Sequence, residues 1–205
     1  MKKTKVFFLV LASVCSFSLL MAQGVAMTPK DSITLTVESV LSLLRDRELS
    51  LPDKKEERRS RIRALINNRF DYKEMSMRSL ARHWRERTPE EAKEFVAVFS
   101  DLLVSSYIGK LEGYTDEKVT YNKEVLKGNG KYGVVSTTII SKDVDIPIDY
   151  KLILRDDKWW VYDVVVEGVS FISTYRSQYD TIIVRESYAG LIQKMKKQLD
   201  EVNAM

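Results

Sequence analysis

The sequence predicts an α+β fold in which an antiparallel meander of about four strands packs against several helices. In the first half of the chain, apolar residues recur at intervals of three and four, the spacing of one helix face. Between residues 118 and 167 the interval changes to two, and short turns separate the segments. Consecutive strands joined by such short turns must be antiparallel, because parallel neighbours need a crossover of about a dozen residues. The segregation of helical and strand-rich stretches therefore favours α+β over alternating βαβ units.

The first helix is predicted to begin after Thr28, where a capping residue, an early proline and an acid follow one another as Thr28-Pro29-Lys30-Asp31. Its apolar stripe consists of Ile33, Val37, Val40, Leu41 and Leu44. Residues 52–68 form a densely charged second segment, in which Ile62, Leu65 and Ile66 supply the apolar contact face. Its charges alternate in sign, which is typical of a solvent-exposed face. A third helix is predicted to follow Asp71.

The clearest element boundary is Thr88-Pro89-Glu90-Glu91, which combines a cap, a proline at the first helical position and a capping-box glutamate. The helix that it opens is predicted to run to about Glu112 and to end at Gly113. Its apolar face is wider than an ordinary core-facing stripe, and comprises Phe95, Val96, Val98, Phe99, Leu102, Leu103 and Tyr107. Two interpretations remain open: a central helix packed on two sides, or a helix that partly lines an apolar cavity.

The strand-rich stretch divides at two sets of turn residues, Gly128-Asn129-Gly130 and Asp156-Asp157. The predicted strands are residues 118–126, 132–141, 146–154 and 158–167. In the third, the apolar Ile146, Ile148, Tyr150, Leu152 and Leu154 alternate with Pro147, Asp149, Lys151 and Arg155 except at Ile153, which indicates one apolar face. A last helix is predicted after Ser187.

Residues 1–26 have the organisation of a cleaved signal peptide. Three lysines precede an uncharged apolar run, Val6 to Met21, and small residues follow at the spacing that a signal peptidase reads. A retained membrane anchor is the alternative, but this run is shorter than the ~20 residues that span a bilayer. A lipoprotein is less favoured, because Val14 precedes Cys15 where that processing site needs a small residue. We expect export, and a mature chain of residues 27–205 forming one domain. A division into a helical lobe (27–113) and a strand-rich lobe (114–205) is left open.

Removal of the signal peptide changes the chemistry of the chain. The formal net charge is +4 for the whole sequence, and loss of Lys2, Lys3 and Lys5 leaves 30 basic against 29 acidic residues. A nearly neutral chain does not favour nucleic acid as a partner. The only cysteine, Cys15, is also removed, so no disulfide or thiolate metal site is expected, and His83 is the only histidine.

Motifs for catalysis or cofactor binding are missing from the sequence. Its GxGxxG at residues 128–133 leads into a predicted strand and not into a helix, and it contains no GxxxxGK[ST], HExxH or GxSxG. We therefore expect no catalytic residues, no metal and no cofactor, and a binding function in place of an enzymatic one. The alternatives are a small enzyme that uses Asp163 or Glu167 beside His83 as acid or base, and a chaperone-like protein that binds other chains.

Two segments resemble the MlaC family, the periplasmic phospholipid-binding proteins of the lipid-asymmetry or toluene-tolerance transport system. They are FDYKEMSMRSLARHWRERTPEEAKEFVAVFSDLLVSSYIGKLEGY (70–114) and WVYDVVVEGVSFISTYRSQY (160–179). The resemblance implies a fold partly like nuclear transport factor 2, with a deep apolar pocket between sheet and helices. It also implies a periplasmic carrier, with bound glycerophospholipid as cargo, that shuttles between an inner-membrane ABC transporter with MCE domains and an outer-membrane lipoprotein complex.

The wide helix face, the apolar strand faces and the apolar residues that follow Gly168 together give the residues that we expect to contact this lipid. They are Phe95, Phe99, Leu102, Leu103, Tyr107, Ile148, Tyr150, Leu152, Val165, Phe171 and Ile172. The sequence leaves open the direction of transport, the headgroup preference, the number of acyl chains bound, the oligomeric state and the cleavage site.

Overall fold

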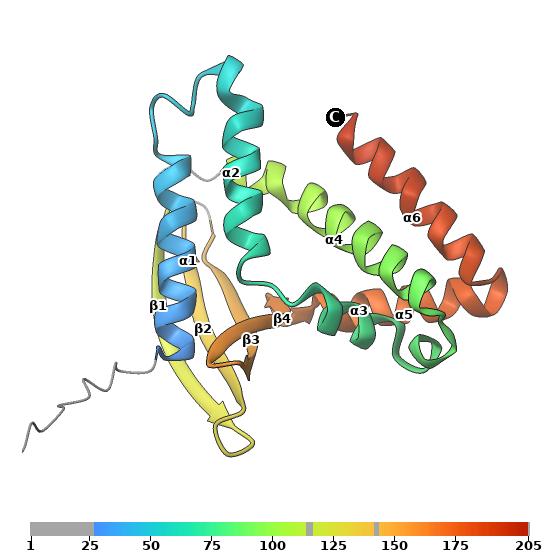
Figure 1. Cartoon of the computed structure of the whole chain (residues 1–205). Helices are drawn as coiled ribbons and strands as arrows, with labels where there is room; N and C mark the ends of the chain where they lie inside the picture. Colours follow the sequence, from blue (N-terminus) through green and yellow to red (C-terminus); the bar gives the residue numbers. More distant parts are fainter. Residues whose placement is uncertain (1–26, 114–116, 142–143, 205) are drawn as a thin grey trace, which may run out of the picture.

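A computed structural model describes residues 27–113, 117–141 and 144–204. Within these ranges the helices are α1 (Pro29–Leu44), α2 (Lys55–Asn67), α3 (Tyr72–Leu80), α4 (Pro89–Glu112), α5 (Phe171–Arg185) and α6 (Tyr188–Asn203), with short 3₁₀ helices η1 (Pro52–Lys54) and η2 (Ala81–Glu86). The strands are β1 (Lys118–Lys127), β2 (Tyr132–Ile140), β3 (Ile146–Arg155), β4 (Lys158–Val166) and β5 (Val169–Ser170). Figure 1 shows α1 lying along the sheet, while α4 and α6 extend away from it.

The strands form one antiparallel sheet in the order β1-β2-β3-β4-β5. Each strand pairs with its neighbour in sequence, which confirms the predicted meander and the α+β class. The structure differs from the predicted four strands by one more strand, β5, whose two residues Val169 and Ser170 pair with the end of β4. Such a short segment offers too little alternation to be recognised as a strand from sequence.

The predicted capping box at Thr88 is present, and the predicted cap at Thr28 also forms a capping box. The Thr28 hydroxyl accepts a hydrogen bond from the Asp31 amide at 3.1 Å, and the Asp31 carboxylate accepts one from the Thr28 amide at 3.1 Å. Thr88 and Glu91 make the same reciprocal pair at the start of α4, at 3.2 and 3.0 Å. Because each box satisfies amides that no helical carbonyl can reach, it sets where the helix begins.

A β-bulge interrupts the pairing of β3 with β4. Lys151 lies opposite Asp163, but the next residue, Leu152, lies opposite Val161, so Tyr162 is the extra residue on β4. One extra residue exchanges the two faces of a strand, because side chains alternate with a period of two. Val161 and Val164 consequently both lie in the buried cluster on one side of the sheet.

Helix α1 packs closely on this apolar sheet face. Gly133 of β2 lies directly beneath the start of α1, where an added Cβ would be 2.8 Å from Cγ of Pro29. The indole Nε1 of Trp159 donates a hydrogen bond to the carbonyl of Met27 at 3.0 Å. The cluster between α1 and the sheet contains Ile33, Val135, Leu152, Trp159, Val161 and Val164.

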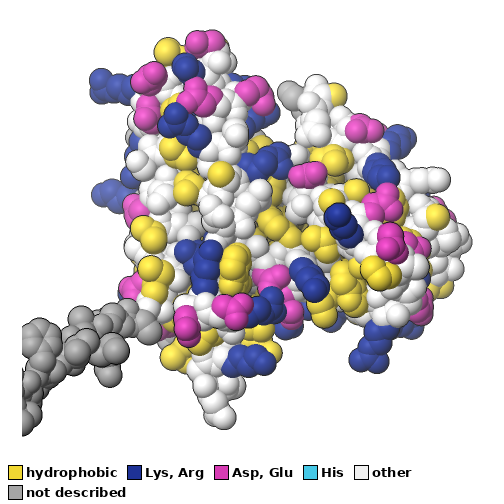
Figure 2. Space-filling model, in the orientation of Figure 1, with side chains coloured by type: hydrophobic (Ala, Val, Ile, Leu, Met, Phe, Trp, Pro, Cys, Tyr) yellow, Lys and Arg dark blue, Asp and Glu magenta, His cyan; other side chains and the backbone are white. Residues whose placement is uncertain are grey.

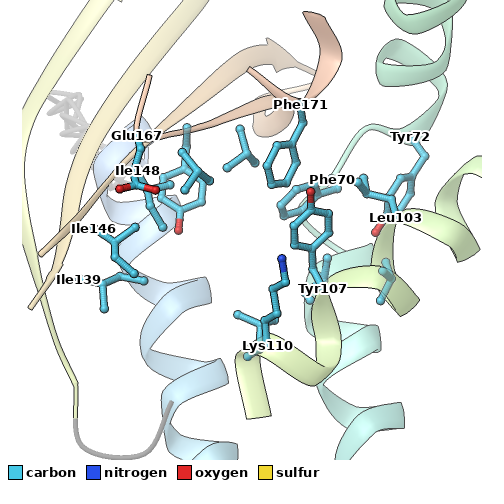
Figure 3. Close-up of a pocket in the computed structure, with 16 residues that line it drawn as sticks. Phe70, Tyr72, Leu103, Tyr107, Lys110, Ile139, Ile146, Ile148, Glu167 and Phe171 are labelled. Carbon is cyan, nitrogen blue, oxygen red and sulfur yellow. The ribbon is translucent and has the colours of Figure 1, made fainter. Parts of the chain in front are cut away.

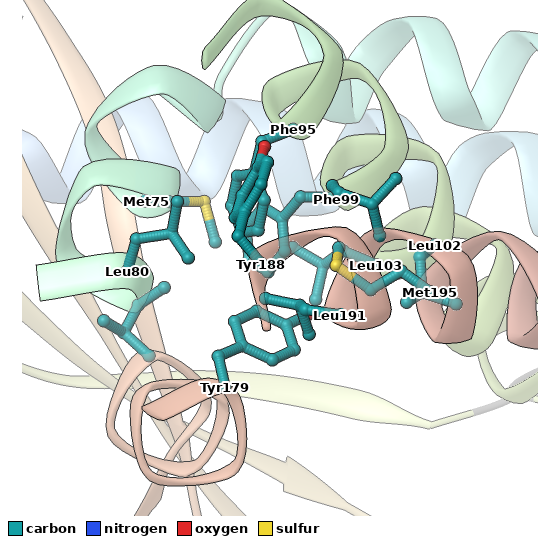
Figure 4. Close-up of a cluster of buried hydrophobic side chains, with 12 residues drawn as sticks. Met75, Leu80, Phe95, Phe99, Leu102, Leu103, Tyr179, Tyr188, Leu191 and Met195 are labelled. Atoms are coloured by element: carbon teal, nitrogen blue, oxygen red, sulfur yellow. The ribbon is translucent and has the colours of Figure 1, made fainter. Parts of the chain in front are cut away.

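A second cluster lies among the helices away from the sheet (Figure 4). Phe95 and Phe99 of α4 stack on each other at 5.7 Å and meet Tyr179 of α5 edge-on. The buried members are Met75, Leu80, Phe95, Phe99, Leu102, Leu103, Ile172, Tyr179, Tyr188, Leu191, Ile192 and Met195. Residues from both sides of position 113 thus build this cluster, as they build the one beneath α1.

In the described ranges, no helix is long and apolar enough to cross a membrane. The molecular surface carries charges of both signs. Figure 2 shows basic and acidic side chains interspersed over the face in view, with no broad area of a single sign.

Candidate functional site: an apolar cavity between sheet and helices

A cavity of about 460 Å³ lies between the sheet and the helices α2, α3, α4 and α5 (Figure 3). Ile148 and Tyr150 of β3 and Val164 and Val166 of β4 form directly opposed pairs on its sheet side. The full lining is Ile66, Phe70, Tyr72, Leu103, Val104, Tyr107, Lys110, Leu111, Ile139, Ile146, Ile148, Tyr150, Val164, Val166, Glu167 and Phe171. Apolar and aromatic side chains dominate this list, so the cavity suits a hydrocarbon ligand.

A smaller chamber of about 160 Å³ adjoins the main cavity beneath α1. The two share wall residues, which are Ile66, Phe70, Leu111, Ile139, Ile148 and Tyr150. Val37, Val40, Leu41 and Leu44 of α1 close the small chamber. The apolar space therefore continues along the sheet from α4 to α1.

An aromatic wall closes the α4–α5 side of the cavity. The ring of Tyr107 stacks on that of Phe171, with centroids 4.6 Å apart and planes 21° apart. Burial raises the pKa of Tyr107, and it raises the pKa of Tyr150, on the sheet side, to about 12. Both phenols therefore stay neutral at physiological pH, and they add hydroxyl groups without adding charge to the lining.

Five of the eleven residues proposed from sequence lie in the cavity wall: Leu103, Tyr107, Ile148, Tyr150 and Phe171. The structure brings them together from α4, β3 and the start of α5. These elements are far apart in sequence. They become neighbours because the strands pair in an antiparallel sheet and α5 packs against β4 of that sheet.

The other six residues lie elsewhere. Phe95, Phe99 and Leu102 of α4 and Ile172 of α5 are buried in the helical cluster. Leu152 shares a sheet face with Ile148 and Tyr150, but it is 0% exposed and packed in the cluster beneath α1.

Val165 is absent from the cavity wall because of the bulge at Tyr162. Strict alternation from Val161 would place Val165 on the cavity face. The extra residue exchanges the faces, so Val164 and Val166 line the cavity instead. A β-bulge depends on how a strand pairs with its neighbour, so the sequence of β4 alone does not indicate the bulge at Tyr162.

Several wall residues were not proposed from sequence. Ile146 continues the alternating face of Ile148, and Ile66 belongs to the apolar face predicted for residues 52–68, so pattern alone could have suggested both. Phe70 lies between helices and forms an isolated bridge with Val161. Nothing in its local sequence indicates that position.

The residues of the enzymatic alternative do not form one site. Nε2 of His83 lies 2.8 Å from the carboxylate of Asp180 on α5. The Asp163 carboxylate is occupied by Lys151 at 2.9 Å and by Ser170 at 2.7 Å, while Glu167 lies at the cavity. Among the residues that the structure describes, no cluster of acidic, histidine or cysteine side chains could hold a metal ion.

A larger hollow of about 920 Å³ lies between α2, α4 and α6, but its chemistry is different. Its lining includes Glu56, Arg59, Ser60, Arg63, Ser105, Ser106, Lys110, Gln198 and Asn203. Such a wall favours water over hydrocarbon. Lining chemistry, not size, therefore identifies the cavity at the sheet as the candidate site.

Comparisons with known proteins agree with this geometry. Residues 35–197 match the family model described as MlaC protein. The chain is 23% identical over 122 residues to the intermembrane phospholipid transport system binding protein MlaC of Haemophilus influenzae; the match covers 58% of this chain and 57% of that protein. This chain thus spans little more than half the length of that curated relative.

A solved structure, the phospholipid-binding protein of Ralstonia solanacearum in complex with a phospholipid, has the same fold. The two superpose with a TM-score of 0.75 at 22% sequence identity, over 86% of this chain and 99% of that one. The family model spans most of the sequence, including α2 to α5 and the whole sheet, and confirms the resemblance noted from sequence. The chain belongs to the MlaC family.

Proposed function

We propose that this protein is a phospholipid carrier, which binds the acyl chains of a glycerophospholipid in the cavity between sheet and helices. The observation that carries the proposal is the apolar lining: fourteen of its sixteen residues are uncharged. The headgroup would remain at the solvent boundary. The cargo named for the Ralstonia protein and the transport system named for the Haemophilus relative support this assignment.

The energetics of acyl chains explain why an enclosed site is needed. Two chains of ordinary length carry about thirty methylene groups, and burial stabilises each by ~0.8 kcal/mol, on the order of 20–25 kcal/mol in all. A shallow surface groove would lose much of this free energy. Spontaneous release into water would be very slow for the same reason, so transfer requires direct contact with a donor or acceptor.

We propose the periplasm as the compartment, since residues 1–26 have the pattern of an export signal. Those residues lie outside the described structure. The partners that we propose are an inner-membrane transporter with MCE domains and an outer-membrane lipoprotein complex, as the family resemblance implies. No catalytic role is proposed for any residue.

The decisive experiment is native mass spectrometry of the exported protein purified from cells, followed by solvent extraction. We expect a mass increment equal to one phospholipid per chain and recovery of that lipid in the extract. A protein that purifies empty and takes up no lipid from vesicles would contradict the proposal. Turnover of a small substrate by such an empty protein would support the enzymatic alternative.

A further inference from the structure

The cavity wall contains two charged residues, Lys110 and Glu167, and these are also its two exposed residues. Lys110 lies in the last turn of α4, and Glu167 lies in the turn between β4 and β5. Figure 3 shows the Lys110 amine directed into the cavity from the helix side, with the Glu167 carboxylate at the sheet side. The two exposed charges therefore stand on opposite walls of the cavity, where the cavity meets solvent.

Neither charge has an ion-pair partner within the described ranges. The acid nearest to Lys110 in sequence, Glu112, is already engaged by Arg58 at 3.0 Å and by Arg59 at 2.9 Å. The Lys110 amine instead lies 5.2 Å from the centroid of the Tyr107 ring, which is itself part of the cavity wall. Its methylene stem can follow the apolar wall while the amine stays hydrated at the cavity mouth.

We infer that Lys110 and Glu167 recognise the headgroup of the bound lipid: Lys110 pairs with the phosphodiester, and Glu167 pairs with a primary amine beyond it. This inference rests on the proposed carrier function. With the acyl chains in the cavity, the phosphate lies at the cavity mouth, where an ammonium group can donate charge-assisted hydrogen bonds to it.

Glu167 then determines which phospholipid fits best. A headgroup of the ethanolamine type carries one negative and one positive group, which match the two side chains in order. A glycerol headgroup carries the phosphate but no cation, so the Glu167 carboxylate gains no partner and repels the phosphate. The cavity mouth is thus complementary to a zwitterionic headgroup with a primary amine.

The test is a competition for loading. Delipidated protein is incubated with vesicles that contain equal amounts of phosphatidylethanolamine, phosphatidylglycerol and diacylglycerol with identical acyl chains, then re-isolated and extracted. We expect the wild type to prefer phosphatidylethanolamine over phosphatidylglycerol about threefold, and both over diacylglycerol about tenfold, as partly exposed charge pairs allow. High salt should reduce both preferences.

Two substitutions separate the two charges. Lys110→Met keeps the apolar stem, and it should lower the ratio of phospholipid to diacylglycerol about fivefold, whereas Lys110→Arg should retain most of it. Glu167→Gln should abolish the preference for the ethanolamine headgroup and leave the ratio to diacylglycerol unchanged. Lys93→Met is the matched control, because Lys93 is an exposed lysine in the first half of the same helix and far along it from the cavity wall.

The outcomes distinguish this inference from the function on which it rests. If the variants load fully with the wild-type distribution of headgroups, the charges do not select the headgroup, and the carrier function stands. If the wild type loads no lipid from any vesicle, the carrier proposal fails and the inference fails with it.

Discussion

At the scale of single residues, β3 provides two positions that look alike in sequence and differ in environment. Ile148 and Leu152 are both aliphatic, and both lie on the apolar face of the strand. Ile148 lines the cavity, whereas Leu152 is 0% exposed within the cluster beneath α1. The contrast allows ligand binding to be separated from core packing.

We predict that Ile148→Asp lowers lipid occupancy about tenfold or more. It should lower the free energy of unfolding by less than Leu152→Asp does. A carboxylate at Ile148 repels acyl chains but can be hydrated from the cavity, whereas one at Leu152 is buried without a partner, at a cost of several kcal/mol. Lipid extraction per folded molecule and urea unfolding measure the two effects. Equal destabilisation by both substitutions, with normal lipid content, would place Ile148 in the packed core.

The ion pairs of Glu112 give a prediction that depends on pH. Burial raises the pKa of this carboxyl, but hydrogen bonds from Arg59 and Arg58 outweigh burial and hold the pKa below its ordinary value. A depressed folded-state pKa stabilises the protein above the unfolded-state value of about 4.3, and this contribution is lost as the pH falls through the folded-state pKa.

Glu112→Gln should accordingly lower the free energy of unfolding by about 1–2 kcal/mol at pH 7, since two arginines lose their acceptor. The difference from the wild type should shrink below pH 4. Glu56→Gln is the control, because Glu56 is 85% exposed and lies 3.8 Å from the same Arg59, so its effect should be near zero. Urea unfolding across this pH range measures the effect. A difference between Glu112→Gln and the wild type that does not change with pH would contradict the prediction.

At the scale of elements, the junction between β4 and α5 decides whether the start of α5 is fixed or acts as a gate. The Asp163 carboxylate, 4% exposed, accepts hydrogen bonds from the Ser170 hydroxyl at 2.7 Å and from the Ile172 amide at 3.2 Å. Ser170 in turn caps α5 by accepting from the Ser173 amide at 3.0 Å. These contacts hold the first turn of α5 against the sheet.

We therefore predict that residues 171–180 exchange their amide hydrogens at similar slow rates in the lipid-free and lipid-loaded protein. Hydrogen exchange is the appropriate measurement, because it reports local opening directly. Residues 146–154 of the sheet serve as the internal reference. Strong protection of 171–180 that appears only on loading would instead identify this segment as a gate for lipid entry.

At the scale of the whole molecule, the described fold is anchored at its first residues. The Met27 carbonyl accepts a hydrogen bond from Trp159, and Thr28 caps α1. Cleavage after Ala26 would leave these contacts intact, whereas cleavage several residues later would remove the cap, which typically contributes about 1 kcal/mol.

We predict that the exported protein begins within two residues of Met27. Intact-mass measurement of protein isolated from the exported fraction tests this directly. Recovery of a chain that retains residues 1–26 would refute cleavage of the signal peptide. Cleavage well beyond Thr28 would contradict the position of the site.

The local structure and the fold class of this protein could be predicted from its sequence. The capping boxes at Thr28 and Thr88 act within three residues, and the alternation in β3 acts within one strand, so each could be predicted without knowledge of any neighbour. Short turns then required an antiparallel meander, and two segments indicated the family.

Which apolar side chains line the cavity depends on contacts between elements that are distant in sequence. The bulge at Tyr162 replaces Val165 by Val164 and Val166, because the phase of β4 depends on its pairing with β3. The wide face of α4 divides between the helical cluster, with Phe95, and the cavity, with Tyr107, because α5 and α6 cover only part of it. Lys110 and Glu167 both line this cavity for the same reason: long-range packing, not local propensity, determines which residues share one site.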